Sequence, residues 1–273
     1  MGEQQEVIAD LRAAGVLAAI RWAYGSATRR SLEMYCEADG LDQAWLGNTR
    51  FTLFRDRLDR VFACHRYTVY AADGTRDTDI LHGELSEYDV HTMPAIPPGT
   101  VRRADLRGSA GWACRQRRFL IASAEYGRID ALPWQEKSYT KQLVALQRSP
   151  DHRQPSLFEE LDESEDPDGA AEAGEPLATF VIAHTLDSKS ASFELSFGRP
   201  LLNPGGPAWY WREDLLAEPL PGVRPAADSA PAVIAETRVP DAPVRLRRPE
   251  GGRLEPGYPD AARPEAGRRD SAR

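Results

Sequence analysis

Two stretches of this 273-residue chain are poor in large apolar residues, and they limit where a folded core can form. Residues 149–176 carry ten acidic residues, and residues 218–273 carry ten prolines but neither Phe nor Trp. Such stretches cannot bury enough apolar surface to offset the entropy lost on ordering the chain. We therefore predict one domain built from two segments, residues 1–148 and 178–217, with an acidic disordered insertion over 149–177 and a disordered, proline- and arginine-rich tail over 218–273.

Apolar residues recur at helical spacing in the first part of the chain. They predict one helix over residues 3–23, followed by Gly25, and a second helix that begins at Ser26 and ends at Glu37. A third helix is predicted to begin at Asn48, because large apolar residues recur along one side of it while arginines and aspartates cover the other. The apolar positions are Phe51, Phe54, Leu58, Val61 and Phe62.

Beyond residue 65 the apolar period changes to two, which is typical of strands. The patterns predict a strand over 66–71, weak helical character over 73–89, a hairpin or two adjacent strands over 111–126, a helix over 133–146, a hairpin over 178–197 and a further strand at 209–211. Two or three strands alone are only marginally stable, so those of the second segment should pair with strands of the first. The expected fold class is α+β, with N-terminal helices packed on a small, mainly antiparallel sheet.

The net charge of −8 is concentrated in the acidic insertion, since residues 151–180 alone carry −9. The folded segments are therefore close to neutral, and the chain is not expected to coat nucleic acid. Its longest apolar run, residues 15–20, is far too short to cross a bilayer, and residues 1–6 lack the basic start of a secretory signal. We expect a cytoplasmic protein with no membrane partner.

A short apolar motif, Gln154-Pro155-Ser156-Leu157-Phe158, interrupts the acidic insertion. It resembles the docking peptide by which bacterial replication and repair proteins bind the DNA sliding clamp, whose pattern is a Gln, two spacer residues and Leu-Phe. The resemblance covers these five residues and implies the clamp as a partner. It also implies that Leu157 and Phe158 fill a pocket while the Gln154 amide orients the peptide. Pro155 departs from the commoner aliphatic residue at the second position. The alternative is that Leu157, Phe158 and Leu161 form one apolar turn that packs against this protein's own surface.

Residues 101–120 carry six arginines against a single acid, a local charge of +5. Guanidinium groups bind phosphate in a bidentate manner, and a tryptophan among them could stack on a base. The alternative is a strand edge protected from aggregation by charge. The candidate DNA-contacting residues are Arg102, Arg103, Arg107, Trp112, Arg115, Arg117 and Arg118.

Signals for catalysis, a metal or a cofactor are weaker. Asp187, Lys189 and Glu194 have the residue types of a metal-dependent nuclease, but the first two fall in an expected hairpin turn, where such residues are common. Acidic residues over 73–89, flanked by His82 and His91, match no zinc or calcium spacing. Neither GxGxxG nor GxxxxGK[ST] occurs. We expect no catalytic residues, no metal and no cofactor.

These patterns favour a non-catalytic bacterial accessory protein recruited to the sliding clamp in DNA replication, repair or mobile-element defence. Two alternatives belong to other classes. One is a metal-dependent nucleic-acid-processing enzyme, which requires at least three acids that converge in one cleft. The other is a protein-interaction module with no relation to DNA, which predicts neither clamp binding nor salt-dependent binding to DNA.

Overall fold

The computed structural model describes residues 2–68, 76–147, 149–150 and 177–217. Within them, helices pack on a mixed six-stranded sheet, which confirms the predicted α+β class. The predicted tail and all of the predicted insertion except residues 149, 150 and 177 lie outside the described residues. None of the described helices combines the length and apolar content that a bilayer crossing needs.

Three N-terminal helices precede all six strands in the chain. They are α1 (Glu3–Ala13), α2 (Val16–Glu33) and α3 (Gln43–Val61). Shorter helices follow them along the chain: α4 (Arg76–His82), α5 (Glu87–Thr92) and α6 (Tyr139–Leu146). Single 3-10 turns are formed by Glu37–Asp39, His65–Tyr67 and Trp134–Glu136.

The helix boundaries differ from those predicted. Residues 3–23 do not form one helix, because Gly15 adopts a left-handed conformation (φ 74°) that separates α1 from α2. Gly25 and Ser26 do not end a helix but lie buried inside α2, where the Ser26 hydroxyl accepts a hydrogen bond from Arg57 Nε of α3 at 3.0 Å. A glycine is tolerated within a helix where a neighbouring helix packs closely on it.

The third helix begins earlier than Asn48. Its N-cap is Asp42, whose carboxylate accepts the backbone N–H of Trp45 at 2.7 Å and so satisfies one of the free amides of the first turn. The strand predicted over 66–71 is also wrong in its described part, where residues 65–67 form a 3-10 turn. Residues 69–71 lie outside the described residues.

The six strands lie in the sheet in chain order. Their bounds are β1 (Arg102–Arg103), β2 (Gly111–Cys114), β3 (Arg117–Ser123), β4 (Ala178–Asp187), β5 (Ser192–Pro200) and β6 (Trp209–Asp214). Neighbouring strands are antiparallel except for β3 and β4, which are parallel over the register Arg117–Ala178 to Ser123–His184. The sheet is therefore mainly antiparallel, and its one parallel pair joins the two segments of the chain.

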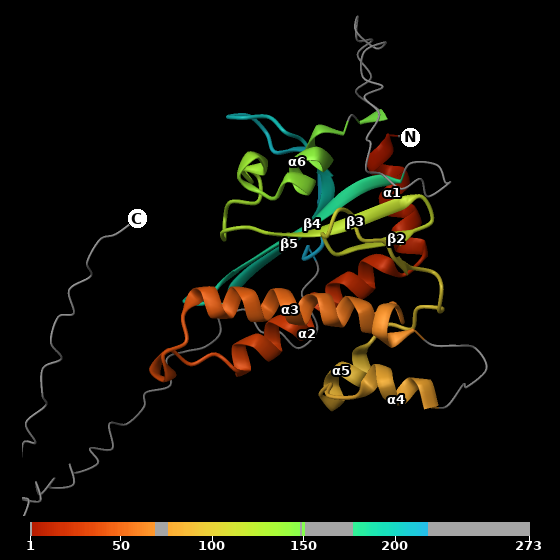
Figure 1. Ribbon diagram of the computed structural model, residues 1–273, viewed down its shortest axis with the longest axis vertical. Helices are drawn as coiled ribbons and strands as arrows, with labels where there is room; N and C mark the ends of the chain where they lie inside the picture. The colour runs from red at the N-terminus through yellow and green to blue at the C-terminus, as the bar shows by residue number, and fades with distance from the viewer. Residues whose placement is uncertain (1, 69–75, 148, 151–176, 218–273) are drawn as a thin grey trace, which may run out of the picture. The chain divides into compact units, whose positions relative to one another are not determined.

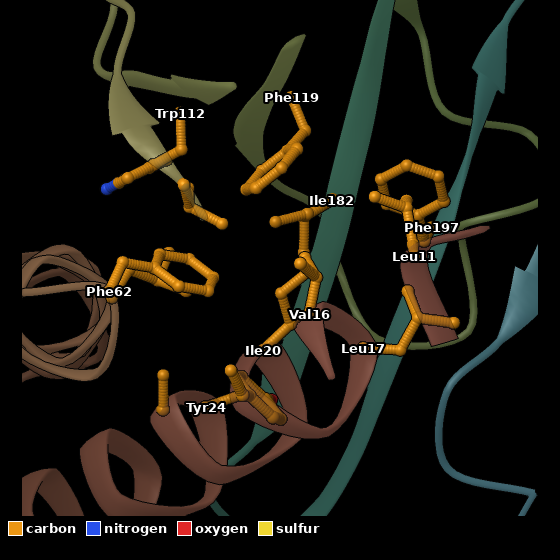
Figure 2. Packing of buried hydrophobic residues seen from close by; sticks show 14 of the residues in the cluster. Leu11, Val16, Leu17, Ile20, Tyr24, Phe62, Trp112, Phe119, Ile182 and Phe197 are labelled. Carbon is orange, nitrogen blue, oxygen red and sulfur yellow. The ribbon is translucent and has the colours of Figure 1, made fainter. Parts of the chain in front are cut away.

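Both faces of the sheet are covered by other elements (Figure 1). Helices α1 to α3 cover one face, where Phe119 and Ile182 point into a core that they share with Tyr24 and Phe62 (Figure 2). The intervening residues of the same strands, such as Leu120, point to the opposite face. There they pack with residues 129–145 and with Trp209. The alternation of side chains along β3 and β4 thus serves two separate apolar cores.

Two glycines provide a matched test of this packing. A Cβ on Gly198 of β5 would lie 2.4 Å from the Trp211 carbonyl oxygen of β6, whereas a Cβ on Gly47 of α3 would meet no atom within 4 Å. We expect Gly198→Ala to lower the free energy of unfolding by about 1–3 kcal/mol through steric overlap. Gly47→Ala should raise it by about 0.5–1 kcal/mol, because alanine is the better helix former. Urea unfolding of both variants measures the two changes, and a neutral Gly198→Ala would contradict the close pairing of β5 with β6.

Candidate functional site

The clamp-like pentapeptide, Gln154 to Phe158, lies outside the described residues, but the residues that flank it do not. On one side, the Ser149 hydroxyl donates a hydrogen bond to Glu3 Oε2 at 3.1 Å. On the other side, the backbone N–H of Ala178 donates to the Gln116 carbonyl at 3.1 Å. Pro150 and Ala178 both line one hollow of about 460 Å³. The described residues on the two sides of the pentapeptide therefore lie beside the same hollow.

The arginines of residues 102–118 do not gather on one face. Arg103 binds Asp59 of α3 and Asp105, with N–O distances of 2.6 and 2.5 Å. Arg117 binds Glu6 and Asp10 of α1 at 2.9 and 2.5 Å. Both side chains are largely buried, so these charges attach helices to the sheet. Arg118 follows Arg117 on the strand and is half-buried on the opposite face.

Trp112 belongs to the core and not to an exposed surface. Its side chain is fully buried, its indole stacks with Phe119 at a centroid distance of 6.3 Å, and Arg103 lies over its ring. The indole N–H donates to Asp59 Oδ1 at 2.9 Å. The ring therefore has no open face on which a base could stack, which corrects the stacking role considered for it.

Three arginines of the set remain exposed: Arg102, Arg107 and Arg115. Arg102 lies on the edge strand β1, and the Arg107 guanidinium lies 5.8 Å from the centre of the Tyr139 ring. The Arg115 side chain is 69% exposed, and its Nη1 lies 3.8 Å from the Asp10 carboxylate. These three are the members of the set with surface available to a phosphate.

Asp187 and Lys189 lie in the β4–β5 turn and form hydrogen bonds within it. Asp187 accepts hydrogen bonds from the Lys189 backbone N–H at 3.1 Å and from the Ser190 hydroxyl at 2.6 Å. Glu194 instead accepts from Thr185 Oγ1 at 3.0 Å and from the Gly127 N–H at 2.9 Å. Across the part of the chain that the structure describes, no group of three His, Cys, Asp or Glu side chains is placed to hold a metal ion.

The structure brings together a different set of polar residues where β3 and β4 end. His184 is fully buried, and its Nε2 lies 3.4 Å from the hydroxyl of Ser123, its register partner on β3. Three aromatic rings surround the imidazole, those of Tyr24, Phe51 and Phe54, with centroid distances of 5.8, 6.2 and 5.4 Å. The Tyr24 hydroxyl donates to the carbonyl oxygen of Thr185 and so attaches α2 to β4.

Cations surround this histidine. Lys137 Nζ donates to the Ser123 carbonyl at 2.9 Å. Burial, and then the charges of Arg50, Lys141 and Lys137, lower the pKa of His184 well below its ordinary value of 6.5. Burial and the neighbouring Lys137 also lower the pKa of Lys141. The imidazole is therefore neutral at physiological pH, and it lies among positive charges.

Three polar atoms of this region have no hydrogen-bond partner among the described residues. They are Nε of Arg50, Oγ1 of Thr28 and Nδ1 of His184, each buried from solvent. Sequence reasoning missed this group because its members come from α3, α2 and β4, and no local spacing connects them. The one local signal was a positively charged residue, Arg50, next to the apolar side of its helix.

No protein-family model matches this chain, and no curated protein sequence or solved structure shows significant similarity to it. The site is therefore described only by the contacts within this structure.

Arg103 is largely buried and Arg102 is exposed on the same strand. Replacing each of them tests whether the Arg103 side chain stabilises the fold. We expect Arg103→Ala to lower the free energy of unfolding by about 2–3 kcal/mol, because Asp59 would keep a largely buried charge without its cation. Arg102→Ala removes an exposed side chain of the same strand and should change stability by no more than about 0.5 kcal/mol. Guanidinium unfolding compares the two, and equal effects would contradict the assignment of Arg103 to the core.

The depressed pKa of His184 predicts a loss of stability in mild acid. The unfolded chain takes up a proton on this imidazole near pH 6.5, whereas the folded protein does not. The unfolded state is therefore stabilised relative to the folded state as the pH falls. We expect the stabilisation to be complete above pH 6.5 and to fall by up to about 1.4 kcal/mol per pH unit below it. His184→Phe should flatten this slope, measured by urea unfolding between pH 7.5 and 5.5. The exposed His91→Gln serves as the control and should leave the slope unchanged.

Proposed function

We propose that this protein is a non-catalytic bacterial accessory protein that docks on the DNA sliding clamp through residues Gln154 to Phe158. It would act in the cytoplasm, in DNA replication, repair or mobile-element defence. The observation that carries the proposal is the match of residues Gln154 to Phe158 to the clamp-binding pattern, in the connection between α6 and β4. The described residues on both sides of it, Ser149 and Ala178, are held there by hydrogen bonds to the folded body.

The expected binding energy of the pentapeptide suits a segment that must enter a pocket on another protein. Burial of the Leu157 and Phe158 side chains would contribute about 3–6 kcal/mol, and a hydrogen bond to the Gln154 amide about 1 kcal/mol. Ordering the five residues would cost about 1–2 kcal/mol each, and less at Pro155, whose backbone is already restricted. The gain and the cost are of similar size, so the contact would be at most weak and reversible. Such a contact recruits a protein to a ring on DNA by mass action, with added avidity where several copies bind one ring.

Contact with DNA forms the secondary part of the same proposal. Arg102, Arg107 and Arg115 are exposed, and guanidinium groups bind phosphate oxygens through charge-assisted hydrogen bonds. Three cations give a small electrostatic contribution that falls as salt increases. Clamp docking would therefore supply the recruitment, and the arginines would add to it only where the clamp already holds the protein next to DNA.

The test is the binding of the full chain to a purified bacterial sliding clamp, with a labelled peptide of residues 150–164 as the fluorescence-polarisation probe. We expect saturable binding of the peptide and its displacement by the full chain. The Leu157→Ala, Phe158→Ala double variant should bind at least about 100-fold more weakly, because it loses about 3 kcal/mol or more of apolar burial. Leu161→Ala lies just outside the motif and is the matched control, which should bind as the wild type does.

Two outcomes would contradict the proposal in different ways. Absence of peptide binding at high-micromolar clamp would remove the partner altogether. Binding of the peptide without displacement by the full chain would mean that Leu157 and Phe158 are occupied by this protein's own surface.

A further inference from the structure

We propose that the structure contains a buried site for a small monovalent anion such as chloride, bound between α2, α3 and β4 by Thr28, Arg50 and His184. Arg50 carries the argument, because it is only 5% exposed and its Nε has no hydrogen-bond partner among the described residues. No ion pair of the described residues includes it either. A buried guanidinium without a counter-charge is costly, so a compensating negative charge is expected next to it.

The other buried arginines provide an internal comparison. Arg57, Arg60 and Arg199 are buried to a similar extent, and each is paired with a carboxylate. Arg57 and Arg60 share Asp56, with N–O distances of 2.5 and 2.9 Å, and Arg199 Nε donates to Glu3 at 2.8 Å. The fold therefore neutralises buried arginines wherever an acid is within reach. Arg50 departs from this rule among the buried arginines that the structure describes.

The positive charge of Arg50 favours an anion over a cation, and the Thr28 hydroxyl and Nδ1 of His184 are able to donate beside it. Burial raises the pKa of the Tyr24 hydroxyl, while Arg50 and the adjacent Thr28 oppose that rise, and Arg50 also acts on His184. When the Ser123 hydroxyl donates to Nε2 of His184, the imidazole proton is on Nδ1. With that tautomer the site offers a guanidinium N–H, an imidazole N–H and a hydroxyl.

The acids near this region are already committed. Glu194, whose charge raises the pKa of Tyr24, accepts its hydrogen bonds from Thr185 and Gly127. The Tyr24 phenol cannot supply the negative charge, because burial raises its pKa to about 12. Thr28 and His184 are fully buried. Such enclosure favours a monatomic ion over a phosphate ester or a peptide carboxylate.

The experiment measures the melting temperature of the full chain against chloride concentration, with sodium gluconate to hold the ionic strength constant. Above the dissociation constant of the site we expect the melting temperature to rise by roughly 3–5 °C for each tenfold increase in chloride. Arg50→Met should abolish this dependence, and Thr28→Val should move its onset to a chloride concentration several-fold higher. Arg55→Met, an exposed arginine of the same helix, is the control and should respond as the wild type does.

A second readout keeps the proposal testable if Arg50→Met does not fold. Crystals of the wild-type protein grown in sodium bromide should show an anomalous peak among Arg50 Nε, Thr28 Oγ1 and His184 Nδ1. A melting temperature that responds to chloride equally in the wild type and in Arg50→Met would overturn the proposal. So would a water molecule in place of bromide at this position. Neither result depends on clamp binding.

Discussion

The parallel pairing of β3 with β4 is the contact on which the rest of the structure depends. The two strands belong to different segments of the chain, and residues 124–177 separate them. Each apolar core takes residues from both: Phe119 and Phe180 face the helices, while Leu120 and Val181 face the other side. Without this pairing, β4 to β6 would form a three-stranded sheet with both apolar faces exposed, which is not stable by itself.

Charged side chains then determine how the helices sit on this sheet. The α1 carboxylates of Glu6 and Asp10 bind Arg117 of β3, and Glu3 of the same helix binds Arg199 of β5. On α3, Asp59 receives hydrogen bonds from Arg103 and from the Trp112 indole. Arginines that a sequence presents as a basic patch are here consumed in attaching one layer to the next. Exposure, and not local charge density, decides which of them are available to a partner.

Local patterns predicted the classes of element well and their limits less well. The helical period around Phe54 and the turn between Asp187 and Ser190 involve neighbours along the chain, so the α+β class and the hairpins were predictable. The predictions placed Gly15 inside a helix and Gly25 just after its end, whereas Gly15 separates two helices and Gly25 lies inside one. Which glycine ends a helix depends on whether another helix packs against it. Trp112 was misjudged for a similar reason: its partner Asp59 is 53 residues away in the sequence. The cluster at His184 was not predictable, since it exists only once α2, α3 and β4 have come together.

The route of the chain between β3 and β4 has a consequence for how this protein could be divided. Every strand that the structure describes lies before Pro150 or after Leu177, and Pro150 and Ala178 line the same hollow. A polypeptide cut there would consist of two fragments whose interface is a complete strand pair with an apolar core on each side. The fold thus consists of two complementary fragments, one on each side of this connection, that are covalently joined. The described strands pair through contacts that lie outside the connection between Pro150 and Leu177.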